Sequence, residues 1–291
     1  MTGIDPLLIV GFVALGCVVG FLAGLLGIGG GMTMVPILTI IFTRIAFPAA
    51  HVVHMAVATS TATIIFTAIS SAREHHRHGA VLWPVVAGLA PGIIAGSLFG
   101  PQVVRGMSTS ALALFFGVFV AFSATQMLLD KKPKPSRELP GKLGMFGVGG
   151  AIGLVSSMVG AGGGFMSVPF MAWCNVRIHN AVATSAALGL PIAIAGTVGF
   201  VIAGLGAQDM PRYSLGYIYL PALVSIVAAS MLTAPIGART AHRWPVKKLK
   251  RAFALAPGPI TLADCIARTD ALLADRAAEL ARLFAAIRRS P

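Results

Sequence analysis

The sequence predicts an all-α protein, a polytopic membrane helix bundle built from two inverted repeats with glycine-interrupted helices. Three observations lead to this fold class. Of the 291 residues, 56% are hydrophobic and only 11% are charged, whereas soluble domains carry about 25% charged residues. The apolar residues gather into segments of about 20 residues, the length that a helix needs to cross a bilayer. A glycine-rich motif and the segment after it occur twice in the same order, which indicates a duplicated unit.

The apolar segments fall into two sets, separated by a basic, proline-containing stretch at 131–142. In the first set we predict membrane helices over 7–26, 56–72, 80–100 and 108–129, with a shorter apolar piece over 32–47. In the second set we predict membrane helices over 144–159, 181–205 and 217–237, with a short piece over 165–175. The predicted organisation is a first membrane repeat (1–130), a basic cytoplasmic linker (131–142), a second membrane repeat (143–251) and an amphipathic cytoplasmic tail (252–291).

Two sequence blocks recur at matching places in the two sets. GLLGIGGGMTMVP at 24–36 aligns with SSMVGAGGGFMSVP at 156–169, and HMAVATS at 54–60 aligns with HNAVATS at 179–185. Two motifs that recur in the same order exclude coincidence, so the chain contains a duplicated transporter-like unit.

The basic clusters predict the orientation of the helices. They lie at 73–77, 131–142 and 239–251, and the positive-inside rule places all three in the cytoplasm. Counting the crossings between them gives the first repeat an odd number, so the two repeats lie upside down relative to each other. Inverted repeats with interrupted helices are typical of carriers, whose binding site lies at the repeat interface near the midplane. We therefore predict a multi-pass protein of the cell inner membrane, with the two glycine loops facing each other.

Charged residues are placed outside the predicted helices. All nine acidic residues fall there, and no lysine or arginine lies in the core of a predicted helix. Buried carboxylates are the usual proton relays and cation ligands of carriers, so this pattern argues against a cation pump, a metal transporter and a carboxylate-based enzyme. We predict no catalytic residue, no metal site, no cofactor and no nucleic-acid partner. The three scattered cysteines also argue against a disulfide framework or a zinc site.

An anion that enters such a protein must be held mainly by neutral dipoles. Glycine lets the backbone leave the helix and come close to a ligand, and the helix that resumes there presents free N–H groups and a positive dipole end. The hydroxyls of the two ATS segments add donors. Close helix packing is the alternative role of such residues, but the duplicated pair of loops favours an anion site. The predicted binding residues are Gly27, Gly29, Gly30, Gly31, Thr59, Ser60, Gly160, Gly162, Gly163, Gly164, Thr184 and Ser185.

Two histidines occupy equivalent positions immediately before the ATS segments. We consider His54 and His179 candidates for gating or proton handling, and we give equal weight to helix-end histidines that face headgroups or loops. The run at 74–78, which contains three histidines, is predicted to be a solvated cytoplasmic loop rather than a metal site.

GLLGIGGGMTMVP and VGAGGGFMSVP, each followed by HxAVATS, resemble the sulfite exporter TauE/SafE family of membrane permeases. The resemblance covers about residues 8–251 and implies export or exchange of sulfur-containing anions, such as sulfite or organosulfonates, without ATP hydrolysis. We therefore predict a secondary transporter for a small sulfur-containing oxyanion. Its partners are the anion and the lipid bilayer, with a homo-oligomer as an open option. A passive anion channel is the nearer alternative, and a membrane enzyme or assembly factor is the more distant one.

The C-terminal region departs from the repeat. A helix equivalent to 108–129 is expected after residue 251, so the second repeat lacks its last span. Instead, Pro257 and Pro259 precede a polar stretch at 261–289 with one apolar stripe, which predicts an amphipathic helix outside the hydrocarbon. A native cytoplasmic tail and a reading-frame change both remain open.

Overall fold

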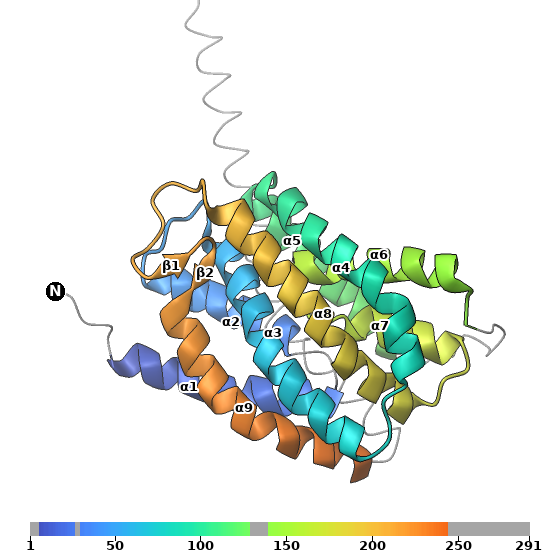
Figure 1. The fold of residues 1–291 in the computed structure, drawn as a ribbon. Helices are drawn as coiled ribbons and strands as arrows, with labels where there is room; N and C mark the ends of the chain where they lie inside the picture. Colours follow the sequence, from blue (N-terminus) through green and yellow to red (C-terminus); the bar gives the residue numbers. More distant parts are fainter. Residues whose placement is uncertain (1–5, 27–29, 129–138, 244–291) are drawn as a thin grey trace, which may run out of the picture.

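The computed structural model of the protein describes residues 6–26, 30–128 and 139–243. Gly27, Gly29, most of the predicted linker and the whole predicted tail lie outside these residues. The described chain is a helical bundle with one short hairpin (Figure 1). Its helices are α1 (Pro6–Leu26), α2 (Gly31–Arg44), α3 (Val52–Arg77), α4 (Trp83–Arg105), α5 (Thr109–Leu128), α6 (Lys142–Val159), α7 (Gly164–Trp173), α8 (Ile178–Gly204) and α9 (Leu220–Arg243).

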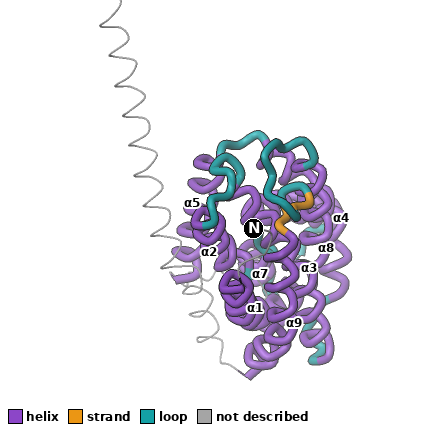
Figure 2. Tube along the Cα trace, turned by 90° about the vertical axis from the view of Figure 1, so that its left-hand side faces the viewer, coloured by secondary structure: helices purple, strands orange, loops and turns teal. Residues whose placement is uncertain are grey.

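Six of these helices are long and apolar enough to cross a membrane, namely α1, α3, α4, α6, α8 and α9. The α2 helix and the Thr109–Ser123 part of α5 are shorter apolar stretches. The α7 helix has only 10 residues. Strand β1 (Ser214–Leu215) pairs in antiparallel fashion with β2 (Ile218–Tyr219) immediately before α9. Figure 2 shows this hairpin and the longer loops together at one end of the bundle. The predicted all-α membrane bundle is therefore confirmed.

The structure corrects the placement of the acidic residues. The α3 helix continues through the 74–78 run, predicted to be a loop, as far as Arg77. Glu74 lies in its last turns and is only 7% exposed, so the prediction that every acid falls outside the helices is wrong at this position. The carboxylate accepts a hydrogen bond from Arg239 Nε of α9 at 2.9 Å. This partner from a distant helix stabilises the buried charge, and the local polar pattern does not reveal it.

Glycine allows the outer helices to pack closely. An ideal Cβ on Gly24 of α1 would lie 1.9 Å from the Ala234 carbonyl oxygen of α9, and one on Gly92 of α4 would lie 2.0 Å from the Phe146 carbonyl oxygen of α6. Both glycines belong to rows with four-residue spacing, the pattern that lets membrane helices touch through their backbones. In each pair, glycines later in one helix contact residues later in the other. The α1 helix therefore runs parallel to α9, and α4 runs parallel to α6.

The central helices α3 and α8 begin with the repeated HxAVATS segment and run in opposite directions. Asn180, at the start of α8, donates to the Ala80 carbonyl oxygen just beyond the end of α3. At the other end, the Tyr217 ring, beyond the end of α8, lies 5.5 Å from the His54 ring near the start of α3. By position in the repeats, α1 is equivalent to α6 and α9 is equivalent to α4. The α1 helix packs on α9, and in the same way α6 packs on α4. Inverted repeats require equivalent helices to run in opposite directions and to pack in equivalent pairs. That the two repeats are inverted across a membrane stays a prediction.

Candidate functional site

The two glycine loops meet inside the bundle. Gly30 and Gly163 precede α2 and α7 with φ angles of 73° and 79°, the left-handed conformation that glycine adopts without strain. The backbone of Gly31 then lies directly against Gly160, because an ideal Cβ on Gly31 would be 1.8 Å from the Gly160 carbonyl oxygen. The start of α2 is thereby placed against the loop between α6 and α7, which belongs to the other half of the chain.

The first ATS segment lies against the loop of the opposite half. The Ser60 hydroxyl donates to the Gly160 carbonyl oxygen at 2.8 Å. An ideal Cβ on Gly160 would also lie 3.0 Å from the Val57 carbonyl oxygen, so α3 and this loop are in backbone contact. Ser60 is fully buried. In this conformation its hydroxyl proton forms a hydrogen bond that joins the two repeats. To donate to an anion, Ser60 must first break its bond to Gly160.

The second ATS segment lies beside the helix that follows its own loop. The Ser167 hydroxyl of α7 donates to the Ser185 hydroxyl of α8 at 3.0 Å, and both side chains are fully buried. The carbonyl oxygen of Gly162 lies 3.6 Å from an ideal Cβ on Gly189 of α8. Gly164 begins α7 and is buried. Both serines and the glycines of the second loop therefore lie on or against α3 and α8, whereas Gly30 lies against Val19 of α1.

Thr59 and Thr184 make equivalent contacts in the two halves. The Thr59 hydroxyl oxygen accepts the backbone N–H of Tyr219, immediately before α9, at 3.1 Å. The Thr184 hydroxyl oxygen accepts the backbone N–H of Leu82, immediately before α4, at 3.0 Å. Each threonine therefore joins its helix to the start of a helix in the other repeat. Accepting one bond still leaves a hydroxyl free to donate its proton.

The interior is polar but mostly neutral. The buried polar side chains of α8, like those of α6 and α7, are serine and threonine hydroxyls, and α3 adds two buried histidines and Glu74. Glu74 is paired near the far end of α3 from the ATS segment. The first-turn N–H groups of α2 and α7 carry partial positive charge. Around the loops, a ligand therefore meets hydroxyls and peptide dipoles rather than fixed charges.

Sequence reasoning missed a cluster of buried hydroxyls beside the predicted residues. Thr61 and Ser157 both lie against Gly196 of α8, and the Ser97 hydroxyl donates to the Gly153 carbonyl oxygen at 3.2 Å. Thr61 and Ser157 occur within or directly beside the repeated motifs, so the serine- and threonine-rich flanks were an available signal. Ser97 gave no such signal, because its position depends on the packing of α4 against α6.

The structure separates the two equivalent histidines. His54 is 2% exposed, and its Nε2 lies 3.1 Å from the carbonyl oxygens of both Val104 and Met107. His179 is half-buried near the start of α8, at the opposite end of the bundle. Their equivalence in sequence therefore does not extend to their surroundings.

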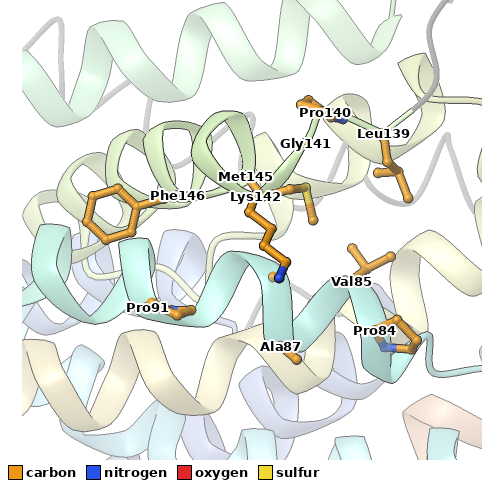
Figure 3. A pocket seen from close by; sticks show the side chains of 11 residues that line it. Pro84, Val85, Ala87, Pro91, Leu139, Pro140, Gly141, Lys142, Met145 and Phe146 are labelled. Atoms are coloured by element: carbon orange, nitrogen blue, oxygen red, sulfur yellow. The ribbon is translucent and has the colours of Figure 1, made fainter.

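A surface pocket of about 650 Å³ lies elsewhere, between the first turns of α4 and α6 (Figure 3). Its lining is apolar apart from Lys142 and backbone groups, and it includes Pro84, Pro91 and Met145. No described residue of the glycine loops or ATS segments lines it. We therefore place the candidate site at the loops and not in this pocket.

Comparison with known proteins places the chain in a family. The family model described as sulfite exporter TauE/SafE matches residues 12–257. The chain belongs to this family. A TauE/SafE protein is a membrane transporter and not an enzyme, in agreement with the sequence prediction.

Curated relatives of this TauE/SafE chain carry matching descriptions. A probable membrane transporter protein of Haemophilus influenzae is 38% identical over 82% of the chain and 91% of the relative. One of Methanocaldococcus jannaschii is 31% identical over 84% of the chain and 89% of the relative. The comparison with solved structures gives no match. Transport is therefore shown at the level of the family, and the transported molecule is not named by the relatives.

Proposed function

We propose that the protein is a secondary transporter of the inner membrane that carries a small sulfur-containing oxyanion, such as sulfite or an organosulfonate, through a site at the paired glycine loops. The observation that carries this proposal is the contact between Gly31 and Gly160. It places the beginning of α2 against the loop that joins α6 to α7. The family description supplies the sulfur-containing class of substrate.

The electrostatics favour an anion. A helix start is equivalent to about half an elementary charge, so the starts of α2 and α7 together carry roughly the complement of one anionic charge. The hydroxyls of Thr59 and Thr184 can add donors to oxyanion oxygens. A site made of dipoles avoids a buried lysine or arginine, whose strong attraction would slow release of the anion on the other side.

The buried position of the site favours a carrier over a passive channel. Gly31, Ser60 and Thr184 are all buried, and bonds between the halves close the surroundings of the loops. A carrier needs such an occluded state between its two openings, whereas a channel conducts through a continuous path. Equivalent helices that run in opposite directions also suit alternating access, in which one repeat rocks against the other.

Counterflow in proteoliposomes tests the proposal. Purified protein is reconstituted with unlabelled sulfite, sulfate, thiosulfate or a sulfonate inside, and uptake of the labelled anion is followed. We expect saturable counterflow for at least one sulfur oxyanion and none for a cation such as choline. Uptake that rises linearly with concentration and shows no counterflow would support the channel. Absence of transport for the whole panel in correctly folded protein would reject the proposal.

A further inference from the structure

We infer that His51, His54 and Tyr217 form a proton-binding site that makes transport of the anion proton-coupled. This inference rests on the proposed anion transport. The three side chains lie at the end of the bundle that holds the β1–β2 hairpin, opposite the Glu74–Arg239 pair. His51 caps the start of α3, His54 lies in its first turn, and Tyr217 comes from the hairpin.

The hydrogen bonds of His54 fix which nitrogen is free to take a proton. Its Nε2 lies 3.1 Å from the carbonyl oxygens of Val104 and Met107. A carbonyl only accepts, so Nε2 carries hydrogen and donates to both. The neutral ring then has its lone pair on Nδ1. That atom is buried and has no hydrogen-bond partner among the described residues, which leaves a buried base with unused capacity.

His51 supplies a second imidazole beside His54. Its Nδ1 is also buried without a hydrogen-bond partner in the described part of the chain. The rings of His51 and His54 have centroids 5.9 Å apart, and the Tyr217 ring lies 5.6 Å and 5.5 Å from them. Burial raises the pKa of the Tyr217 hydroxyl, with Arg105 acting in the opposite direction, so the phenol stays neutral. The two imidazoles are therefore the groups that can bind a proton here.

The surrounding charges explain why the proton would bind together with an anion. Besides the three residues of the site, the described ionisable side chains at this end are Arg44, Arg105, Asp209, Arg212, Tyr213 and Tyr219. All of them are exposed except Tyr219, which is buried. The described cations outnumber the one carboxylate, and the start of α3 adds partial positive charge. A proton bound here adds positive charge to an end that is already positive, and an anion at the loops balances that charge. Two imidazoliums this close repel each other, so the pair binds one proton.

The histidine pair is joined structurally to the anion site. Tyr217 and Tyr219 belong to the same hairpin segment. The backbone N–H of Tyr219 donates a hydrogen bond to the Thr59 hydroxyl oxygen. His54 and Thr59 lie five residues apart on α3, or about 7.5 Å along the helix axis. A proton at the pair and an anion at the loops therefore attract each other over a short, weakly screened distance. We expect the protein to carry one proton with each anion.

Two transport assays on the same vesicles test the coupling. Counterflow at equal pH on both sides measures anion exchange, and uptake driven by an acid exterior measures coupling. A gradient of one pH unit changes the accumulation ratio about tenfold for each coupled proton. The variants are His54→Gln and His51→Gln, because glutamine retains a donor without the titrating ring. The control is His76→Gln, an exposed histidine at the other end of the same helix.

We expect wild type and His76→Gln to show both activities, and the two test variants to retain counterflow while losing the response to the gradient. Wild-type counterflow with no effect of the gradient would overturn the coupling and leave anion transport standing. Absence of wild-type counterflow would reject transport itself. A full gradient response in both test variants would also overturn the inference. A further test uses purified wild-type protein in weak buffer. When the transported anion is added, the protein should take up about one proton per bound anion. No proton uptake would contradict the proposal.

Discussion

Gly31 and Gly160 show how single residues determine the approach of the two halves. Any side chain on Gly31 would occupy the position of the Gly160 carbonyl oxygen, which is backbone and cannot rotate away. The carbonyl is held in turn by the Ser60 hydroxyl. The geometry of the site therefore depends on the absence of one methyl group.

The variant Gly31→Ala is expected to lose both stability and transport. Overpacking of this kind costs about 1–3 kcal/mol, and here the backbone itself must shift. We expect a lower Tm in detergent and a counterflow rate reduced by roughly a factor of ten or more, as for a 1.4 kcal/mol change or larger. Gly11→Ala and Gly147→Ala are matched controls, since neither glycine has a neighbouring atom within 4 Å of an ideal Cβ. A Gly31→Ala protein with wild-type Tm and counterflow would show that the loops do not form this contact.

Replacing Thr59 or Thr184 by valine keeps the shape of the side chain and removes the hydroxyl. Each change leaves a backbone N–H, that of Tyr219 or Leu82, without its acceptor. One ordinary hydrogen bond contributes about 0.5–1.5 kcal/mol, so the affinity for the anion should fall by about tenfold at most.

Thr→Ser at the same positions should restore affinity, because serine retains the hydroxyl. The measurement is the concentration dependence of counterflow, with membrane insertion checked for each protein. If all the valine variants bind the anion normally, these hydroxyls only join the helices, and the anion site lies elsewhere.

At the scale of helices, the contact between Glu74 and Arg239 connects the end of α3 to α9. Glu74 is 9% exposed at its side chain and Arg239 is 57% exposed, so the pair is intermediate between buried and surface ion pairs. Arg77 also approaches the carboxylate at 3.8 Å, but its side chain is 61% exposed. We therefore assign the attachment of α9 at this end mainly to Arg239.

A double-mutant cycle measures this attachment. Glu74→Gln and Arg239→Gln should each lower the Tm, and the double variant should lose less than the sum of the two. The coupling energy should be about 1 kcal/mol, between the values for exposed and buried pairs. Arg77→Gln serves as the control and should change the Tm little. Strict additivity of Glu74→Gln and Arg239→Gln would mean that the contact does not stabilise the protein.

At the scale of the whole molecule, the helix directions predict which loops share a side of the membrane. The α3–α4 turn, the start of α6 and the start of α8 lie at one end, because Asn180 contacts Ala80. The hairpin, the end of α4 and the start of α3 lie at the other end, because Tyr217 contacts His54. The positive-inside rule predicts that the first end, which carries Arg73, Arg77 and Arg239, faces the cytoplasm.

Cysteine labelling in intact cells tests this topology. After replacement of the native cysteines, single cysteines at Gly106 and Gly206 should react with a membrane-impermeant thiol reagent. Cysteines at Gly79 and Gly141 should react only after the cells are opened. All four glycines lie outside the helices, with no atom closer than 3.5 Å to an ideal Cβ. Gly79 has a φ of 63°, which disfavours a side chain, so correct insertion of that variant is checked first. Labelling of Gly79 and Gly106 from the same side would contradict the predicted orientation.

The sequence alone determined the membrane class, the duplication and the extent of most helices. These properties are carried by local composition and by motifs that repeat along the chain, so they need no knowledge of which segments touch. It also singled out the glycines and ATS hydroxyls that the structure brings together. Gly30 and Gly163 were identifiable because an interruption between two helices requires backbone freedom that glycine provides.

Only the tertiary structure decided which partners these residues meet. Glu74 is buried because Arg239 approaches from a helix far along the chain, and no local pattern encodes that pairing. His54 and His179 share a motif, yet the end of α4 surrounds one and the other is half-buried. Gly31 faces Gly160 because α1 packs against α9 and α6 packs against α4, and both pairs join opposite repeats. Contacts between distant segments depend on the summed packing of the whole bundle, which short sequence motifs do not specify.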